Sequence, residues 1–220
     1  MECLNLSKLK DVAVKHKLTI YNKPNRVYIP LVKNNDANVT ILVKKGDYIF
    51  KGSVVAKRKG ENRLNIFSSV SGKVVDFEEH TIFNGKKVKC VVIENDFNER
   101  IKKRYDKKEN LNSLSKRDFI ATLENCGIVG LGGIGFPQYK KYDIDNKINT
   151  LIVNAVECEP YVSADYFVVK EKCEEILEMI DGILEINNID RAIIAPSMLL
   201  ISRIASIISK SCSHLSLTIK

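Results

Sequence analysis

The stretch that decides the fold of this chain is Gly127-Ile-Val-Gly-Leu-Gly-Gly-Ile-Gly-Phe-Pro-Gln-Tyr-Lys-Lys141, called here the glycine loop. Five glycines lie within its first nine residues. Glycine lets the backbone approach a ligand closely and leaves N–H groups free to bind anions. The loop therefore favours a phosphate-bearing cofactor, to which a nearby lysine adds charge. A flexible turn is the other interpretation of so many glycines.

A second segment, Asn154-Ala-Val-Glu-Cys-Glu-Pro-Tyr-Val-Ser-Ala-Asp165, is called here the acidic loop. It follows an apolar run, 148–153, that is typical of a buried strand, and open α/β sheets bind ligands beyond such strand ends. Asn154 can both donate and accept hydrogen bonds at an amide or pyrimidine edge. Glu157 and Glu159 can accept hydrogen bonds from a carboxamide or a ribose hydroxyl. The alternative is a polar loop whose acids favour the next helix N-terminus.

The sequence around these loops alternates between helical and strand patterns. We expect a helix capped by Ser115 and Asp118, with one face formed by Phe119, Ile120, Leu123 and Cys126. A long helix capped by Ser163 should follow, and then a strand at 192–195. The last expected elements are a helix from Pro196 to about Lys210 and a strand at 214–219. Strands that alternate with helices indicate a parallel sheet.

The first part of the chain has a different pattern, with short β-branched runs separated by turn residues from about Val27 to Glu94. Asn84-Gly85 is a good two-residue hairpin turn, and short, closely spaced strands predict a small barrel or sandwich. A charged stretch follows and is typical of a linker. The predicted domains are therefore a β domain at 1–98, a linker at 99–114 and an α/β domain at 115–220.

Two segments, 43–56 and 68–74, resemble the lipoyl- or biotinyl-type barrel-sandwich hybrid. A true carrier domain presents a modifiable lysine at a tight turn between them. That position falls near Glu61, flanked by Gly60 and Asn62, so the reactive lysine is missing. We expect an unmodified scaffold or docking module.

The glycine loop and the acidic loop, taken in this order, resemble the RnfC family of the Rnf electron-transport complex, over about residues 24–210. The same motifs are similar to the flavin subunit of respiratory NADH dehydrogenase and to the clostridial electron-transfer protein associated with proline reductase. The resemblance implies an α/β plus small β fold: an N-terminal barrel-sandwich hybrid, then an incomplete Rossmann-like flavin- and NADH-binding domain with a parallel sheet.

The resemblance also implies FMN and NADH as cofactors. Four glycines would wrap the FMN phosphate and ribityl chain: Gly130, Gly132, Gly133 and Gly135. Lys141 would contact the flavin or its phosphate, and Asn154 would hold the isoalloxazine ring. For NADH, Phe136 would stack on the adenine and Glu159 would lie near the nicotinamide. It implies no acid–base side chain, because the cofactor carries the hydride chemistry. No metal ligand is expected.

Three features depart from the family pattern. Ile134 stands where alanine is usual, and Gln138-Tyr139-Lys140 replaces smaller residues. The family continues further, to a ferredoxin domain with two Cys-x-x-Cys runs for 4Fe-4S clusters. The six cysteines here include no C-x-x-C, and the default expectation for them is free buried thiols. A fragment, a frameshifted product and a split protein that a partner completes all fit this truncated pattern.

Composition limits the other function classes. The chain has 220 residues, a net charge of +8 and 45% hydrophobic residues, but no nucleic-acid-binding motif. Residues 1–10 lack the apolar core of a signal peptide, and 192–208 falls short of a membrane span. We expect a cytoplasmic protein, soluble or peripheral to the inner membrane through partners.

Two function hypotheses follow. The leading one is an electron-transfer flavoprotein subunit that passes electrons from NADH through FMN towards iron–sulfur centres in an Rnf-type ion-translocating complex, with the other subunits as partners. The alternative is a non-catalytic docking or assembly module of a redox complex, or a fragment of the proline-reductase-associated protein.

Overall fold

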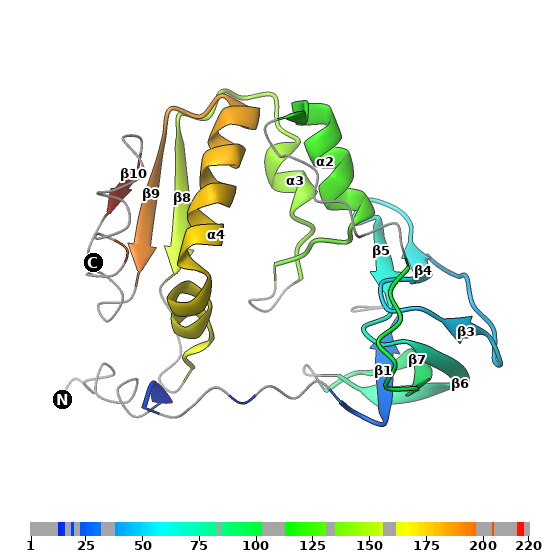
Figure 1. The fold of residues 1–220 in the computed structure, drawn as a ribbon. Helices are drawn as coiled ribbons and strands as arrows, with labels where there is room; N and C mark the ends of the chain where they lie inside the picture. The colour runs from blue at the N-terminus through cyan, green and yellow to red at the C-terminus, as the bar shows by residue number, and fades with distance from the viewer. Residues whose placement is uncertain are drawn as a thin grey trace, which may run out of the picture. The chain divides into compact units, whose positions relative to one another are not determined.

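The computed structural model describes residues 13–15, 19, 23–31, 38–82, 85–102, 113–130, 135–155, 162–196, 204 and 215–217. Contacts divide the chain into two compact units, drawn in Figure 1. The β unit comprises 21–110 and 117–144, and the α/β unit comprises 1–20, 111–116 and 145–220. The segment at 117–144, which sequence patterns group with the α/β domain, thus clusters with the β strands.

The β unit contains two antiparallel sheets, as expected for a small β domain. Its strands are β1 (Arg26–Pro30), β2 (Val39–Ile41), β3 (Tyr48–Ile49), β4 (Val54–Arg58), β5 (Leu64–Phe67), β6 (Gly72–Thr81) and β7 (Lys87–Asn95). The first sheet has the order β1-β7-β6-β3, and the second has the order β2-β4-β5. Both sheets contribute to one core, in which Val55, Val74 and Ile93 are fully buried.

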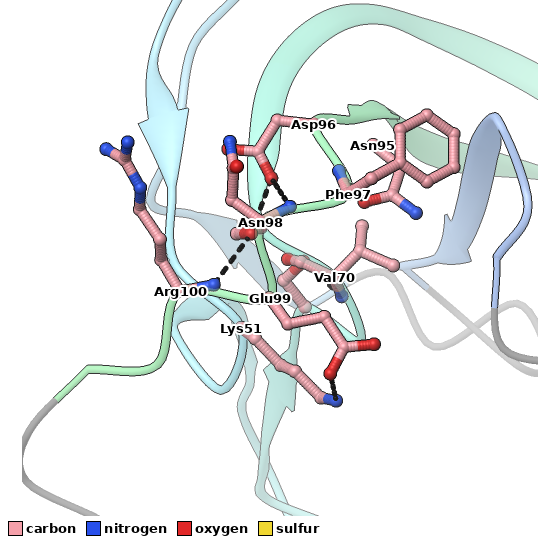
Figure 2. Close-up of polar contacts among 10 residues, drawn as sticks. Lys51, Val70, Asn95, Asp96, Phe97, Asn98, Glu99 and Arg100 are labelled. Atoms are coloured by element: carbon pink, nitrogen blue, oxygen red, sulfur yellow. Dashed lines mark hydrogen bonds and ion pairs between the residues drawn. The ribbon is translucent and has the colours of Figure 1, made fainter.

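The turn that follows β7 is held by a polar network around Asp96. The hydroxyls of Ser71, at 2.7 Å, and of Tyr48 donate to the Asp96 carboxylate, which also accepts the amide of Asn98 at 3.0 Å. Figure 2 shows this carboxylate turned back over Asn98. Phe97 has a φ of 58°, a conformation that L-residues rarely adopt. The network therefore fixes a strained turn at the end of β7.

A second set of contacts ties this turn to β3 and its neighbours. The amide of Arg100 donates to the Ser71 hydroxyl at 3.0 Å, and the amide of Lys51 donates to the Arg100 carbonyl at 2.9 Å. The Lys51 ammonium faces the Glu99 carboxylate at 3.6 Å, as Figure 2 shows. The chain is thus fixed as far as Arg100, beyond the last residue of β7.

The Asp96 network predicts an acid-sensitive β unit. Hydrogen bonds from Tyr48 and then Ser71 hold the pKa of the Asp96 carboxyl well below its usual range. A carboxyl with a lowered folded-state pKa stabilises the fold above its unfolded pKa of about 3.9, and this contribution is lost as the pH falls below that value. In the wild type, the urea concentration at the midpoint of unfolding should fall between pH 7 and pH 3, as measured by circular dichroism. We expect this fall to be smaller in Asp96→Asn.

The control for this prediction is Glu79→Gln, which removes an exposed carboxylate of β6 outside the network. This variant should keep the acid-dependent decline of the wild type. Equal pH profiles for wild type and Asp96→Asn would contradict the role of the network.

The α/β unit contains a parallel sheet, as the alternating pattern predicts. Its strands are β8 (Thr150–Ala155), β9 (Arg191–Pro196) and β10 (Leu215–Leu217), in the order β10-β9-β8 with both pairs parallel. The helix α4 (Ala164–Asn187) connects β8 to β9, and Figure 1 shows it running along these strands. The apolar side of α4 packs with alternate residues of both strands into one core that includes Leu177, Ala155 and Ile194.

Several local predictions for this unit need correction. Pro196 is the last residue of β9, paired with Ala155, and not the first turn of a helix. The predicted strand at 148–153 begins two residues later, and it is not buried throughout because Ile152 is 67% exposed. Ser163 is the N-cap of α4, but its side chain makes no capping hydrogen bond. Apart from Ile204, the predicted helix up to Lys210 lies outside the described residues.

The long helix α4 has a break inside it and a defined end. Lys172 has non-helical dihedral angles, φ −120° and ψ 25°. At the other end, Asn188 adopts the left-handed conformation, and the amides of Asn188 and Ile189 donate to the carbonyls of Glu185 and Leu184. These two bonds form the Schellman motif that commonly ends helices.

The cysteines are only partly as expected. Cys90 and Cys173 are buried free thiols, as expected, whereas the free thiol of Cys126 is exposed. Burial raises the pKa of the Cys90 thiol. Among the described residues, no group of three or more acidic, histidine or cysteine side chains is placed to hold a metal ion. No described helix is long and apolar enough to cross a membrane.

Candidate cofactor-binding loop

The glycine loop begins as the end of a helix. The helix α2 (Lys116–Asn125) is followed by Gly127, whose φ of +67° is left-handed. The amide of Ile128 donates to the carbonyl of Leu123 at 3.1 Å, and that of Gly127 to the carbonyl of Glu124 at 3.1 Å. These bonds also form a Schellman motif, so the first glycine of the loop serves to end α2.

Gly127 also lies against the β unit's second sheet. A Cβ atom at this position would lie 2.5 Å from the carbonyl oxygen of Asn65 and 2.9 Å from the ring of Phe67. The side-chain amide of Asn65 in turn donates to the Asn125 carbonyl at 2.8 Å. The beginning of the glycine loop is therefore docked on β5 through a contact that only glycine permits.

The two ends of the loop are joined to each other. Val129 and Pro137 form an antiparallel bridge, and the amide of Gln138 donates to the Ile128 carbonyl at 2.9 Å. The amide of Gly130 donates to the carbonyl of Phe136, also at 2.9 Å. The loop is thus a closed hairpin whose base is fixed by backbone hydrogen bonds.

A short helix, α3 (Tyr139–Tyr142), follows the loop and anchors it a second time. Tyr139 is 2% exposed, and its hydroxyl donates to the carbonyl of Glu61 at 3.1 Å. The Arg63 guanidinium lies 5.4 Å from the centre of this ring and donates to both carboxylate oxygens of Glu124 on α2. Burial raises the pKa of the Tyr139 hydroxyl. Both ends of the loop are therefore attached to the β4–β5 hairpin.

Four of the predicted binding residues can be placed within the β unit. Gly130 and Phe136 are brought together by their backbone bond, and Gly135 has a left-handed φ of +61°. Phe136 is 42% exposed, and Lys141 is exposed on α3. Because the Gly130 amide already donates to Phe136, it does not offer an N–H to an anion in this conformation. Gly132 and Gly133, with Ile134, lie outside the described residues.

The other predicted binding residues belong to the acidic loop. Asn154 is the fifth residue of β8 and is exposed at the carboxyl end of that strand, as the sequence predicts. Glu157 and Glu159 lie outside the described residues.

Sequence reasoning missed the apolar cavity beside the loop. A space of about 360 Å³ is lined by Gly127, Val129 and Gly135 of the loop and by strand residues, among them Leu64, Ile66 and Phe67. Cavities of this size suit small organic ligands. The apolar residues of Leu64-Asn-Ile-Phe67 were the available signal, but only the fold shows that β5 faces the loop.

Two family models match the chain, one for each of its parts. The RnfC barrel sandwich hybrid domain matches residues 3–98, and the Nuo51 FMN-binding domain matches residues 123–204. The first match confirms the predicted barrel-sandwich domain, and the second covers both the glycine loop and the acidic loop.

Curated relatives agree with these matches. The C subunit of the proton-translocating ferredoxin:NAD(+) oxidoreductase complex of Clostridium ljungdahlii is 32% identical over 78% of this chain and 38% of its own length. The C subunit of the Na(+)-translocating ferredoxin:NAD(+) oxidoreductase complex of Acetobacterium woodii is 35% identical over 76% of this chain and 38% of its own length. The C subunit of the ion-translocating oxidoreductase complex of Haemophilus influenzae strain PittEE is 29% identical over 76% of this chain and 26% of its own length.

The chain spans about two-fifths of the length of the first two of these relatives. The two matched domains follow each other in the order that the resemblance implies. The chain therefore belongs to the RnfC family of Rnf electron-transport complexes and corresponds to the N-terminal portion of that family.

Proposed function

We propose that this chain is part of an electron-transfer flavoprotein subunit that passes electrons from NADH through FMN towards iron–sulfur centres in an Rnf-type complex. The observation that carries the proposal is the closed glycine loop, which lies within the segment matched by the FMN-binding domain. FMN would supply hydride acceptance and one-electron transfer, and the chain's own residues would bind and orient it.

The described residues of the loop fit such a ligand. Gly130 and Gly135 present no side chain, so their backbone can approach a ligand closely. Phe136 offers an exposed aromatic face and Lys141 an exposed cation. These groups suit stacking on a planar ring and pairing with a phosphate, respectively.

The binding roles extend this proposal to individual residues. The FMN phosphate and ribityl chain would be surrounded by Gly130, Gly132, Gly133 and Gly135. Lys141 would pair with the phosphate, and Asn154 would hold the isoalloxazine ring. For NADH, Phe136 would stack on the adenine, and Glu157 and Glu159 would accept hydrogen bonds near the nicotinamide. The β8–α4–β9 succession supports a Rossmann-like domain at 115–220, which follows the barrel-sandwich domain at 1–98 and the linker at 99–114 in the sequence.

The named relatives support a proposal for the partners. Because these relatives are subunits of multi-subunit oxidoreductase complexes, other subunits of such a complex are the partners that we propose. We place the chain in the cytoplasm, at the cytoplasmic face of the inner membrane through those partners.

Replacing Lys141 tests the flavin site. We expect Lys141→Gln to weaken FMN binding by about tenfold, the usual effect of losing one charge-assisted hydrogen bond. The dissociation constant is measured from the quenching of flavin fluorescence as pure protein is added to FMN. The matched control is Lys140→Gln, which removes the neighbouring positive charge and should leave the affinity within about twofold of the wild-type value.

Two results would count against this proposal. The first is the absence of quenching by the wild-type protein at tens of micromolar, with the glycine loop intact. The second is an equal loss of affinity in the two variants, which would indicate attraction by general charge and not by a specific contact.

A further inference from the structure

A second cavity lies at the hairpin between β4 and β5, and none of the residues assigned to FMN or NADH lines it. Its volume is about 380 Å³, and its lining is rich in cations: Thr40, Lys57, Arg58, Lys59, Gly60, Arg63, Leu64, Asn65, Glu124 and Asn125. Neither the resemblance to the family nor the matched domains assign a role to this cavity. It lies entirely within the β unit.

The register of the sheet explains how these groups come together. Lys57 pairs with Thr40 on β2 and with Asn65 on β5, so the three residues form one row across the strands. Paired residues in neighbouring antiparallel strands extend their side chains to the same face. Lys59 and Arg63 lie just beyond the ends of β4 and β5, and both line the same cavity as this row. The hairpin thus builds a polar, positively charged wall.

The positive charge of this wall is largely uncompensated. Arg63 is paired with Glu124 through two hydrogen bonds, but neither Lys57 nor Lys59 forms an ion pair with any described residue. The Nη2 atom of Arg58 donates to the Asn62 carbonyl at 3.2 Å. Its Nε atom is buried and has no hydrogen-bond partner among the described residues. The uncompensated cations on this face are therefore Lys57 and Lys59, and both are exposed.

The cations are not required to neutralise the end of α2, which borders the cavity. The last carbonyls of that helix already have donors: Thr122 accepts the amide of Cys126, Leu123 that of Ile128, Glu124 that of Gly127, and Asn125 the side chain of Asn65. The helix end is therefore satisfied by the Schellman motif and by β5. Lys57 and Lys59 remain available for a ligand.

We propose that this cavity binds the diphosphate group of a small molecule, with Lys57 and Lys59 as its cationic contacts. The two positive charges match the two negative charges of a diphosphate diester, and the hydroxyl of Thr40 can add a further hydrogen bond. The volume suits a small-molecule ligand. The proposal goes beyond the flavin function, because none of the loop residues assigned to FMN lines this cavity.

Calorimetric titration with inorganic pyrophosphate tests the proposal on the full chain. The wild-type protein should bind pyrophosphate at sub-millimolar concentration, and the double variant Lys57→Gln, Lys59→Gln should bind it at least about tenfold more weakly. The matched control is Lys73→Gln, Lys87→Gln, which removes two exposed lysines of β6 and β7 outside the cavity. Its affinity should stay within about twofold of the wild-type value, because exposed charges at a distance are screened by salt.

Two outcomes would overturn the site: no heat of binding with the wild-type protein, or equal losses in the two double variants. The flavin titration separates this result from the flavin proposal. Lys141→Gln should bind pyrophosphate like the wild type, whereas Lys57→Gln, Lys59→Gln should quench flavin fluorescence like the wild type. If both ligands are lost in both variants, the two sites are not distinct and the proposal is wrong.

Discussion

Gly72→Ala is expected to unfold the β unit. The φ of Gly72 is +153°, and a Cβ atom at this position would lie 1.9 Å from the carbonyl oxygen of Glu94 and 2.9 Å from its carbonyl carbon. The obstacle is backbone that pairs β6 with β7 at one end of their ladder, so it cannot move aside without opening the ladder. Strain and overlap together should cost more than about 4 kcal/mol, which is exceptional for a single methyl group.

Urea unfolding followed by circular dichroism measures this loss. Gly46→Ala is the matched control, because Gly46 also has a left-handed φ, +97°, but a Cβ there meets nothing within 4 Å. This control should lose only about 1–2 kcal/mol, the cost of the left-handed conformation by itself. Equal losses in the two variants would show that conformation, and not the overlap with Glu94, dominates the effect.

Gly127→Ala is expected to detach the glycine loop from β5. The new Cβ would overlap the Asn65 carbonyl oxygen and the Phe67 ring, and the left-handed φ of +67° adds strain, for a total of about 3 kcal/mol. Since Gly127 both ends α2 and touches β5, the loss should fall on α2 and the loop. Hydrogen exchange of the α2 amides should accelerate strongly, and FMN affinity should fall with it if the flavin proposal holds.

The control for this variant is Gly85→Ala. Gly85 has a similar φ, +77°, and a Cβ at this position would meet no atom within 4 Å. It should lose about 1 kcal/mol without a change in the exchange of α2. Unchanged exchange of α2 in Gly127→Ala would mean that the contact with β5 does not hold the loop in place.

Local sequence signals predicted much of the fold. The alternation of β-branched runs and turn residues predicted the β unit, and the alternation of strands and helices predicted the parallel β8 and β9. The capping position at Ser163 was also correct, although its side chain makes no capping bond. These features depend on residues that are close in sequence, and their physical preferences can be read from short windows.

The support of the candidate loop could not be predicted in this way. Gly127 reads as one glycine among five, but it ends α2 and packs on Asn65, which is more than sixty residues earlier in the chain. Tyr139 reads as a departure from the family pattern, yet it is a buried anchor bonded to Glu61. Such contacts depend on which strands and loops the complete fold brings together, and no local pattern encodes that choice.

The break at Lys172 divides α4 into two segments, and the second segment buries more residues in the core than the first. Of the buried residues of this helix, only Val169 precedes the break, whereas Cys173, Leu177 and all the others follow it. Local unfolding of the first segment, 164–171, therefore exposes little buried surface, and the second segment still covers the sheet. Segments with such low opening free energy are those that proteins use to rearrange around their ligands, and this one begins where the acidic loop ends.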